Sequence, residues 1–144
     1  MNSVGHIEYV VCITLLNIKM EKEFIPYEQA LALKELGFDE ECLMYWNDYG
    51  KQAVSRFQLL NKINSWSMNY IEAPTFSQVF RWFRVKYDLR IWIESNHGIS
   101  HFEYVIATTN SDFINKQFND SSYYKTYEEA ELECLKKLIE IVKQ

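Results

Sequence analysis

The sequence predicts a single α+β domain in which three helices pack on an antiparallel sheet, in the order helix, hairpin, helix, hairpin, helix. Three observations support this prediction. The chain has 144 residues, about the size of one domain. Two pairs of segments alternate between apolar and polar residues around short turns, as the strands of hairpins do. Helix-start signals precede three other segments.

The first helix is expected to begin at Pro26 and to end at Leu36. Proline suits a first helical position because its missing N–H would have no partner there. Gly37 followed by Phe38 is the pattern of a Schellman C-terminus, in which a left-handed glycine precedes an apolar residue. The helix is therefore expected to stop cleanly at this glycine.

The second helix is expected to open at Pro74 and Thr75 and to run to about Tyr87. The preceding segment, 61–73, has no clear period and is long for a simple connection. Apolar residues of the helix fall within a single arc of about 100°, which is typical of a buried stripe. This stripe comprises Phe76, Val79, Phe80, Phe83 and Tyr87; the opposite side carries Ser77, Gln78, Arg81 and Arg84; Trp82 and Lys86 flank the stripe.

The third helix has the clearest start signal. Thr126 and Glu129 have the spacing of a capping box, and acidic residues at the start and lysines towards the end match the helix dipole. Its apolar stripe is Tyr127, Ala130, Cys134, Leu135, Leu138, Ile141 and Val142. The hairpin strands are expected at 42–46 with 53–60, joined by the turn 47–50, and at 89–94 with 101–106, joined by the turn 96–98.

Residues 1–19 are expected to form an N-terminal extension or edge strand of a domain that spans residues 20–144. The apolar run Val10–Leu16 is too short to cross a bilayer. It also lacks the preceding Lys or Arg of a secretory signal, and it alternates as a strand does. Three cysteines without a Cys-x-x-Cys spacing indicate reduced thiols and a cytoplasmic location.

No pattern in the sequence indicates a cofactor, a metal site or a catalytic residue. Four scattered glycines exclude the dinucleotide fingerprint and the phosphate-binding loop, which need clustered glycines. His97 and His101 bracket an expected turn and have no third ligand nearby. The acidic run Asp39-Glu40-Glu41 leaves one alternative open, a small hydrolase or nuclease, although such a run is also typical of a solvated turn.

Charge is distributed unevenly along a chain whose net charge is −5. Residues 20–49 hold eight acidic and two basic side chains, whereas residues 50–90 hold two acidic and seven basic ones. Basic residues interleaved with aromatic ones are typical of sites for single-stranded nucleic acid. The alternative is that these cations pair with the acidic first segment and that the aromatic rings belong to the core.

Three groups of residues form distinctive strings: IPYEQAL at 25–31 with KELGFDE at 34–40, FRWFR at 80–84 with KY at 86–87, and TYEEAE at 126–131 with Leu135. Together they resemble a family of small uncharacterised proteins encoded by phages and prophages of gut bacteria. The resemblance spans about residues 20–143 and implies a mobile-element origin and a location in the cytoplasm of a bacterial host, but no catalytic or binding residue.

These observations favour a binding module over an enzyme. A protein partner or a second copy of the chain is preferred, since exposed aromatic and arginine side chains are typical of protein interfaces. Nucleic acid, bound through the basic segment 50–90, is the alternative, and no membrane contact is expected. The candidate contact residues are Trp66, Tyr70, Ser77, Gln78, Arg81, Trp82 and Arg84.

Overall fold

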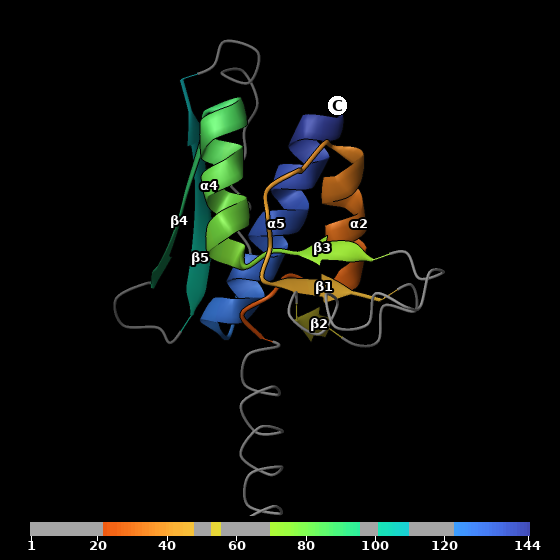
Figure 1. Cartoon of the computed structure of the whole chain (residues 1–144). Coiled ribbons are helices and arrows are strands. Elements are labelled where there is room, and N and C mark those ends of the chain that lie inside the picture. Colours follow the sequence, from red (N-terminus) through yellow and green to blue (C-terminus); the bar gives the residue numbers. More distant parts are fainter. Residues whose placement is uncertain (1–21, 48–52, 56–69, 96–100, 110–122) are drawn as a thin grey trace, which may run out of the picture.

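The computed structural model describes residues 22–47, 53–55, 70–95, 101–109 and 123–144 (Figure 1). The expectations for residues 1–19, Trp66 and His97 lie outside this part. Within it the chain is a mixed α and β structure, as predicted. In chain order the elements are α2 (Tyr27–Glu35), β1 (Met44–Trp46), β2 (Ala53–Ser55), β3 (Ile71–Ala73), α4 (Phe76–Tyr87), β4 (Leu89–Ser95), β5 (Phe102–Thr108) and α5 (Tyr127–Lys143).

Helix α2 ends as the sequence predicts. Gly37 has a φ of 82°, in the left-handed region that glycine adopts without strain. Its N–H donates to the carbonyl of Lys34, and the N–H of Phe38 donates to the carbonyl of Leu33, each at 3.0 Å. These are the two hydrogen bonds of the Schellman motif. At the other end, Pro26 is the N-cap rather than the first helical residue.

The expected helix and hairpin order is not reproduced in full, because a third strand joins the first hairpin. Strand β1 pairs antiparallel with β2, as expected, and also with β3, which gives the order β2-β1-β3. β3 lies in the segment 61–73, where we expected no strand. The described strands therefore form two separate sheets, this one and the β4-β5 pair, instead of one sheet under three helices.

Helix α4 begins with a capping box and ends with a left-handed residue. The N–H of Gln78 donates to the hydroxyl of Thr75, and the Gln78 side chain accepts from the N–H of Thr75. Asp88 follows the helix with a φ of 55°, and its carboxylate accepts hydrogen bonds from the N–H and the hydroxyl of Thr109. These bonds, reinforced by nearby Arg90, lower the pKa of Asp88 and join the end of α4 to the end of β5.

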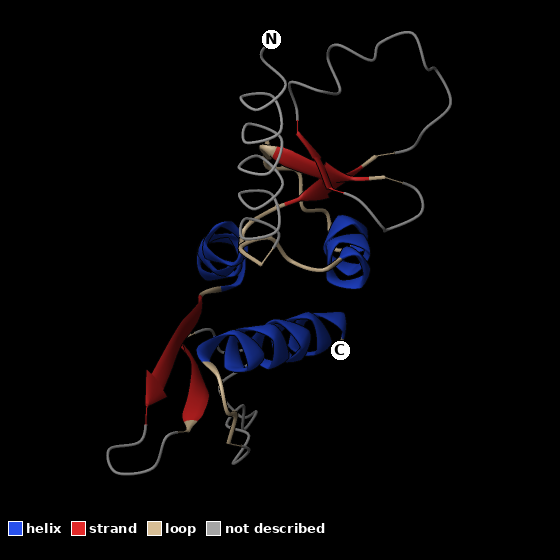
Figure 2. Cartoon of the chain, turned by 90° about the horizontal axis from the view of Figure 1, so that it is seen from below, coloured by secondary structure: helices blue, strands red, loops and turns tan. Residues whose placement is uncertain are grey.

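Helix α5 is the element around which the others pack. It contacts α2, α4 and both strands of the β4-β5 pair (Figure 2), while β3 packs against α2. Its N-cap Thr126 accepts from the N–H of Glu129, as predicted. The Glu129 carboxylate, however, accepts from the N–H of Lys125 and not from Thr126, so the capping box is displaced by one residue.

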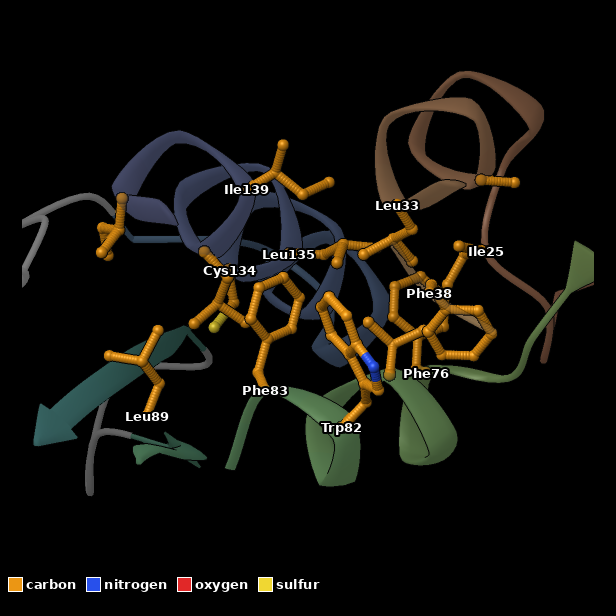
Figure 3. Packing of buried hydrophobic residues seen from close by; sticks show 14 of the residues in the cluster. Ile25, Leu33, Phe38, Phe76, Trp82, Phe83, Leu89, Cys134, Leu135 and Ile139 are labelled. Carbon is orange, nitrogen blue, oxygen red and sulfur yellow. The ribbon is translucent and has the colours of Figure 1, made fainter. Parts of the chain in front are cut away.

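One hydrophobic core joins the three helices and β4-β5 (Figure 3). Phe83 of α4, Leu89 of β4 and Leu135 of α5 are fully buried in it. Leu33 and Phe38 bring α2 and its Schellman turn into the same cluster. The core leaves the opposite side of α4 uncovered, and this is where the predicted contact residues lie.

Candidate binding surface on helix α4

Four exposed side chains form one face of α4, here called the α4 face: Ser77, Arg81, Arg84 and Val85. Their spacing of three to four residues places them side by side along the helix. The opposite side of α4 is held in the core by Phe76, Val79 and Phe83. The backbone under the face is therefore fixed by packing on one side and by the capping box at its start.

The turn that follows α2 borders the α4 face and is bonded to α4 by three side chains. Arg81 contacts Glu40, with Nη2 and Oε2 2.8 Å apart. Gln78 Nε2 donates to the carbonyl of Glu41 at 3.3 Å. Lys86 Nζ donates to the carbonyl of Leu36 at 3.0 Å. For Arg81, the interpretation that basic residues pair with the acidic first segment is confirmed.

Trp82 belongs to the core and not to a contact surface, which corrects its place among the candidate residues. Its side chain is 6% exposed and makes edge contacts with the rings of Phe38 and Phe83. Phe38 contacts the Trp82 ring because the Schellman turn after α2 packs beside α4 and extends the core beyond the apolar stripe predicted for this helix. The Lys86 Nζ lies over the Trp82 ring, 4.6 Å from the centre of the ring.

Arg84 differs from the other cations of α4. In the part of the chain that the structure describes, no ion pair or hydrogen bond of its guanidinium is found, and the side chain is exposed. Val85 beside it is 80% exposed, the highest fraction among the large hydrophobic residues that the structure describes. Sequence reasoning omitted Val85, although it falls opposite the predicted apolar stripe, on the side of Arg81.

Charges around the α4 face balance. α4 carries three cations and the adjoining turn carries three carboxylates, so the two elements together have no excess positive charge with which to attract phosphate groups. The cations are Arg81, Arg84 and Lys86, and the carboxylates belong to Asp39, Glu40 and Glu41.

The other predicted contact residues are not brought onto this face. Tyr70 is half-buried and lies directly before β3, on the far side of that strand from the start of α4. Trp66 lies outside the described residues. Trp92, which the sequence places near the basic segment, is 47% exposed and lies on β4. Ser77, Gln78, Arg81 and Arg84 are the predicted contact residues that α4 holds together.

Groups suited to acid, base or nucleophilic chemistry do not gather here. Burial raises the pKa of the Cys42 thiol to about 12 and raises that of Cys134 further, so both stay protonated near neutral pH. In the acidic run, Glu40 is already paired with Arg81. A search of the described residues finds no cluster of three or more His, Cys, Asp or Glu residues that could hold a metal ion.

Glu131 of α5 is the carboxylate with the largest change in acidity. Partial burial, together with the neighbouring charges of Glu128 and Glu23, raises its pKa from 4.5 to about 7. Glu131 in turn contributes to the raised pKa of Tyr127, which is due first to partial burial. This group lies away from the α4 face, and its effect is on stability.

Comparison with known proteins gives no match: no family model, curated protein or solved structure is significantly similar to the chain. No helix in the described ranges is both long enough and apolar enough to span a bilayer. The function therefore has to be argued from the surface itself.

Proposed function

We propose that the chain is an accessory protein of a phage or other mobile element, acts in the cytoplasm of the host cell, and binds another protein through the α4 face. The exposed Val85 carries the proposal. An apolar side chain held open beside an arginine, on a helix whose backbone is fixed by the core, suits a small protein interface.

The chemistry of the α4 face indicates the kind of segment that fits it. Val85 offers an apolar contact, and Arg84 offers a guanidinium whose donors match a carboxylate. Arg81 keeps its bond to Glu40, so it orders the rim of the surface and does not have to be released. The partner segment is expected to carry an apolar residue next to an acidic one.

Nucleic acid remains the second candidate because Arg84 is available to a phosphate. An exposed ion pair such as that of Arg81 with Glu40 contributes only about 0 to 1 kcal/mol, so a phosphate could replace Glu40. The balanced charge of the surface argues against this reading, since non-specific binding depends on an excess of cations. A hydrolase or nuclease that uses Asp39, Glu40 and Glu41 is disfavoured by the engagement of Glu40.

The test is selection of a random peptide library against the full chain, followed by binding measurements with variants. V85D and R84E are each expected to weaken binding of the selected peptides by at least about tenfold. K34E, which reverses an exposed charge on α2, is the matched control and is expected to bind normally. Single-stranded and duplex DNA and RNA are titrated in parallel at low salt.

Two results would contradict the proposal. Either no peptide is selected that depends on Val85 and Arg84, or nucleic acid binds with a dissociation constant near or below about 10 µM, weakens steeply with salt and loses affinity in R84E. The second result would establish the nucleic-acid alternative.

A further inference from the structure

Among the described residues, strand β4 has one edge without a pairing partner. In the described part of the chain its seven residues pair with β5 alone, in an uninterrupted register from Leu89 opposite Thr108 to Ser95 opposite Phe102. Figures 1 and 2 both show β4 on the outer side of the pair, with β5 nearer to α5. β4 also contacts α4, which it follows directly in the chain. The strand contains no proline, lysine or bulge, which are among the devices that keep an open edge from pairing. Its two charged residues, Arg90 and Glu94, have opposite signs.

The hydrogen bonds at the end of β5 show which backbone groups of β4 face outward. The N–H of Phe102 donates to the carbonyl of Tyr124, and the N–H of Tyr124 donates to the carbonyl of Phe102. Both polar groups of Phe102 thus point away from β4, so Ser95, directly opposite, turns its own groups away from β5. By alternation, the outward N–H and C=O groups belong to Leu89, Ile91, Ile93 and Ser95.

The side chains of β4 would match those of a second copy of β4 paired with it in the antiparallel direction. On the outer face, Arg90 and Glu94 lie two residues on either side of Trp92, and all three are exposed. In an antiparallel pair of β4 strands with a two-fold axis at Trp92, each Arg90 lies opposite Glu94 of the other copy. On the inner face Ile91 lies opposite Ile93, and both are only half-buried in one copy.

The hydrogen-bonding pattern of β4 would bring these opposite side chains close together. Because the outward hydrogen-bonding groups belong to the inner-face residues, Trp92 and the Arg90–Glu94 pairs occupy non-hydrogen-bonded positions, where Cα atoms are about 4.5 Å apart and side chains are nearest. Moving the axis by one residue, to Ile91 or Ile93, places Trp92 opposite Arg90 or Glu94 and leaves no Arg–Glu pair.

A second observation concerns charge within one copy. Glu94 lies directly opposite Glu103 of β5, and like charges in that position destabilise a sheet. Arg90 does not relieve this repulsion within the same copy, because its ion pair is with Asp88, at 3.7 Å. Arg90 of a second copy would lie beside Glu94 and supply the missing positive charge.

We propose that two copies of this chain associate through β4, antiparallel and centred on Trp92, to form a four-stranded sheet in the order β5-β4-β4-β5. The α4 face takes no part in this contact. The dimer would therefore present two α4 faces, and it goes beyond the function proposed above without depending on it.

Site-specific oxidation tests the register. In a C12S background, W92C places two thiols at the two-fold axis, within the Cα separation of about 4.4 to 6.8 Å that a disulfide needs. V105C is the matched control, because Val105 lies opposite Trp92 one strand further out. Its two copies would be about 14 Å apart, three strand spacings.

The expected result is rapid formation of a covalent dimer by W92C and at least about tenfold slower formation by V105C. Equal rates for the two variants, or a W92C protein that stays monomeric under oxidation, would overturn the proposal.

Charge reversal tests the same pairing with Trp92 in place. Sedimentation equilibrium of the full chain is expected to show a monomer–dimer equilibrium. R90E and E94R should each weaken dimerisation by at least about tenfold, because each places like charges opposite one another twice. An equimolar mixture of the two variants, and the double variant R90E/E94R, should restore it, while K34E should match the parent.

A parent chain that stays monomeric at millimolar concentration, or single variants that do not recover on mixing, would exclude this dimer. Peptide binding by the α4 face is measured on the same proteins. A parent chain that binds peptide through the α4 face but stays monomeric contradicts the dimer alone. A parent chain that dimerises but binds no peptide that depends on Val85 and Arg84 contradicts the proposed function alone.

Discussion

Replacing Glu131 by glutamine is expected to stabilise the protein at alkaline pH and to have little effect in acid. Burial of Glu131, with the negative charges of Glu128 and Glu23 nearby, raises its pKa from 4.5 to about 7. The folded chain therefore holds this proton more tightly than the unfolded chain does. Its contribution to stability is complete below about pH 4.5 and is lost as the pH rises through about 7.

The size of the effect follows from the change in pKa. One pKa unit corresponds to about 1.4 kcal/mol, so a rise from 4.5 to about 7 sets an upper limit of about 3 kcal/mol. Solvent reaches a large part of this half-buried side chain and screens the charge, which reduces the expected effect to about 1 to 2 kcal/mol. Glutamine keeps the shape of the side chain and carries no charge at any pH.

Urea unfolding followed by tryptophan fluorescence, at pH 4.5 and at about pH 8, measures this effect as the difference between E131Q and the parent. E140Q is the matched control, because Glu140 is exposed on the same helix. We expect E131Q to gain about 1 to 2 kcal/mol at the higher pH alone. An equal change at both values would refute the reasoning, since it would show that the Glu131 charge is not destabilising in the folded chain.

Three further substitutions test the fold that supports the α4 face, each by denaturant or thermal unfolding. F83A should lose about 3 to 5 kcal/mol because Phe83 is fully buried between α4 and α5, whereas F80A, at a half-buried position, should lose less; equal losses would contradict the core. T75A removes the N-cap of α4 and should cost about 1 kcal/mol, with S77A as a neutral control. G37A should cost about 1 to 2 kcal/mol, because a φ of 82° strains any residue with a Cβ; an unchanged melting temperature would contradict this backbone conformation.

Local signals predicted the ends of the elements well. Gly37 fixes the end of α2 because only Gly37, the next residue, Phe38, and the last helical turn take part in the hydrogen bonds of the Schellman motif. Thr126 marks the start of α5 for the same reason. The strands β4 and β5 were predictable to within two residues, because apolar and polar residues alternate over six positions in each expected strand, 89–94 and 101–106.

Long-range contacts account for what the sequence did not reveal. β3 has three residues, too few for a recognisable period, and it is a strand because β1 pairs with it. Trp82 is buried because Phe38, more than forty positions earlier in the sequence, reaches its ring. The sequence predicted only part of the α4 face. Arg81 and Arg84 are the same residue type on the same side of the helix, and only the folded chain shows that Arg81 is paired with Glu40.

Calorimetric titration of a selected peptide into the parent chain, V85D, R84E and K34E tests most directly whether the α4 face binds protein. We expect V85D and R84E each to raise the dissociation constant by at least about tenfold, equivalent to about 1.4 kcal/mol, and K34E to leave it unchanged. A peptide that binds all four proteins with equal affinity would show that its site lies elsewhere on the chain and would contradict the proposal.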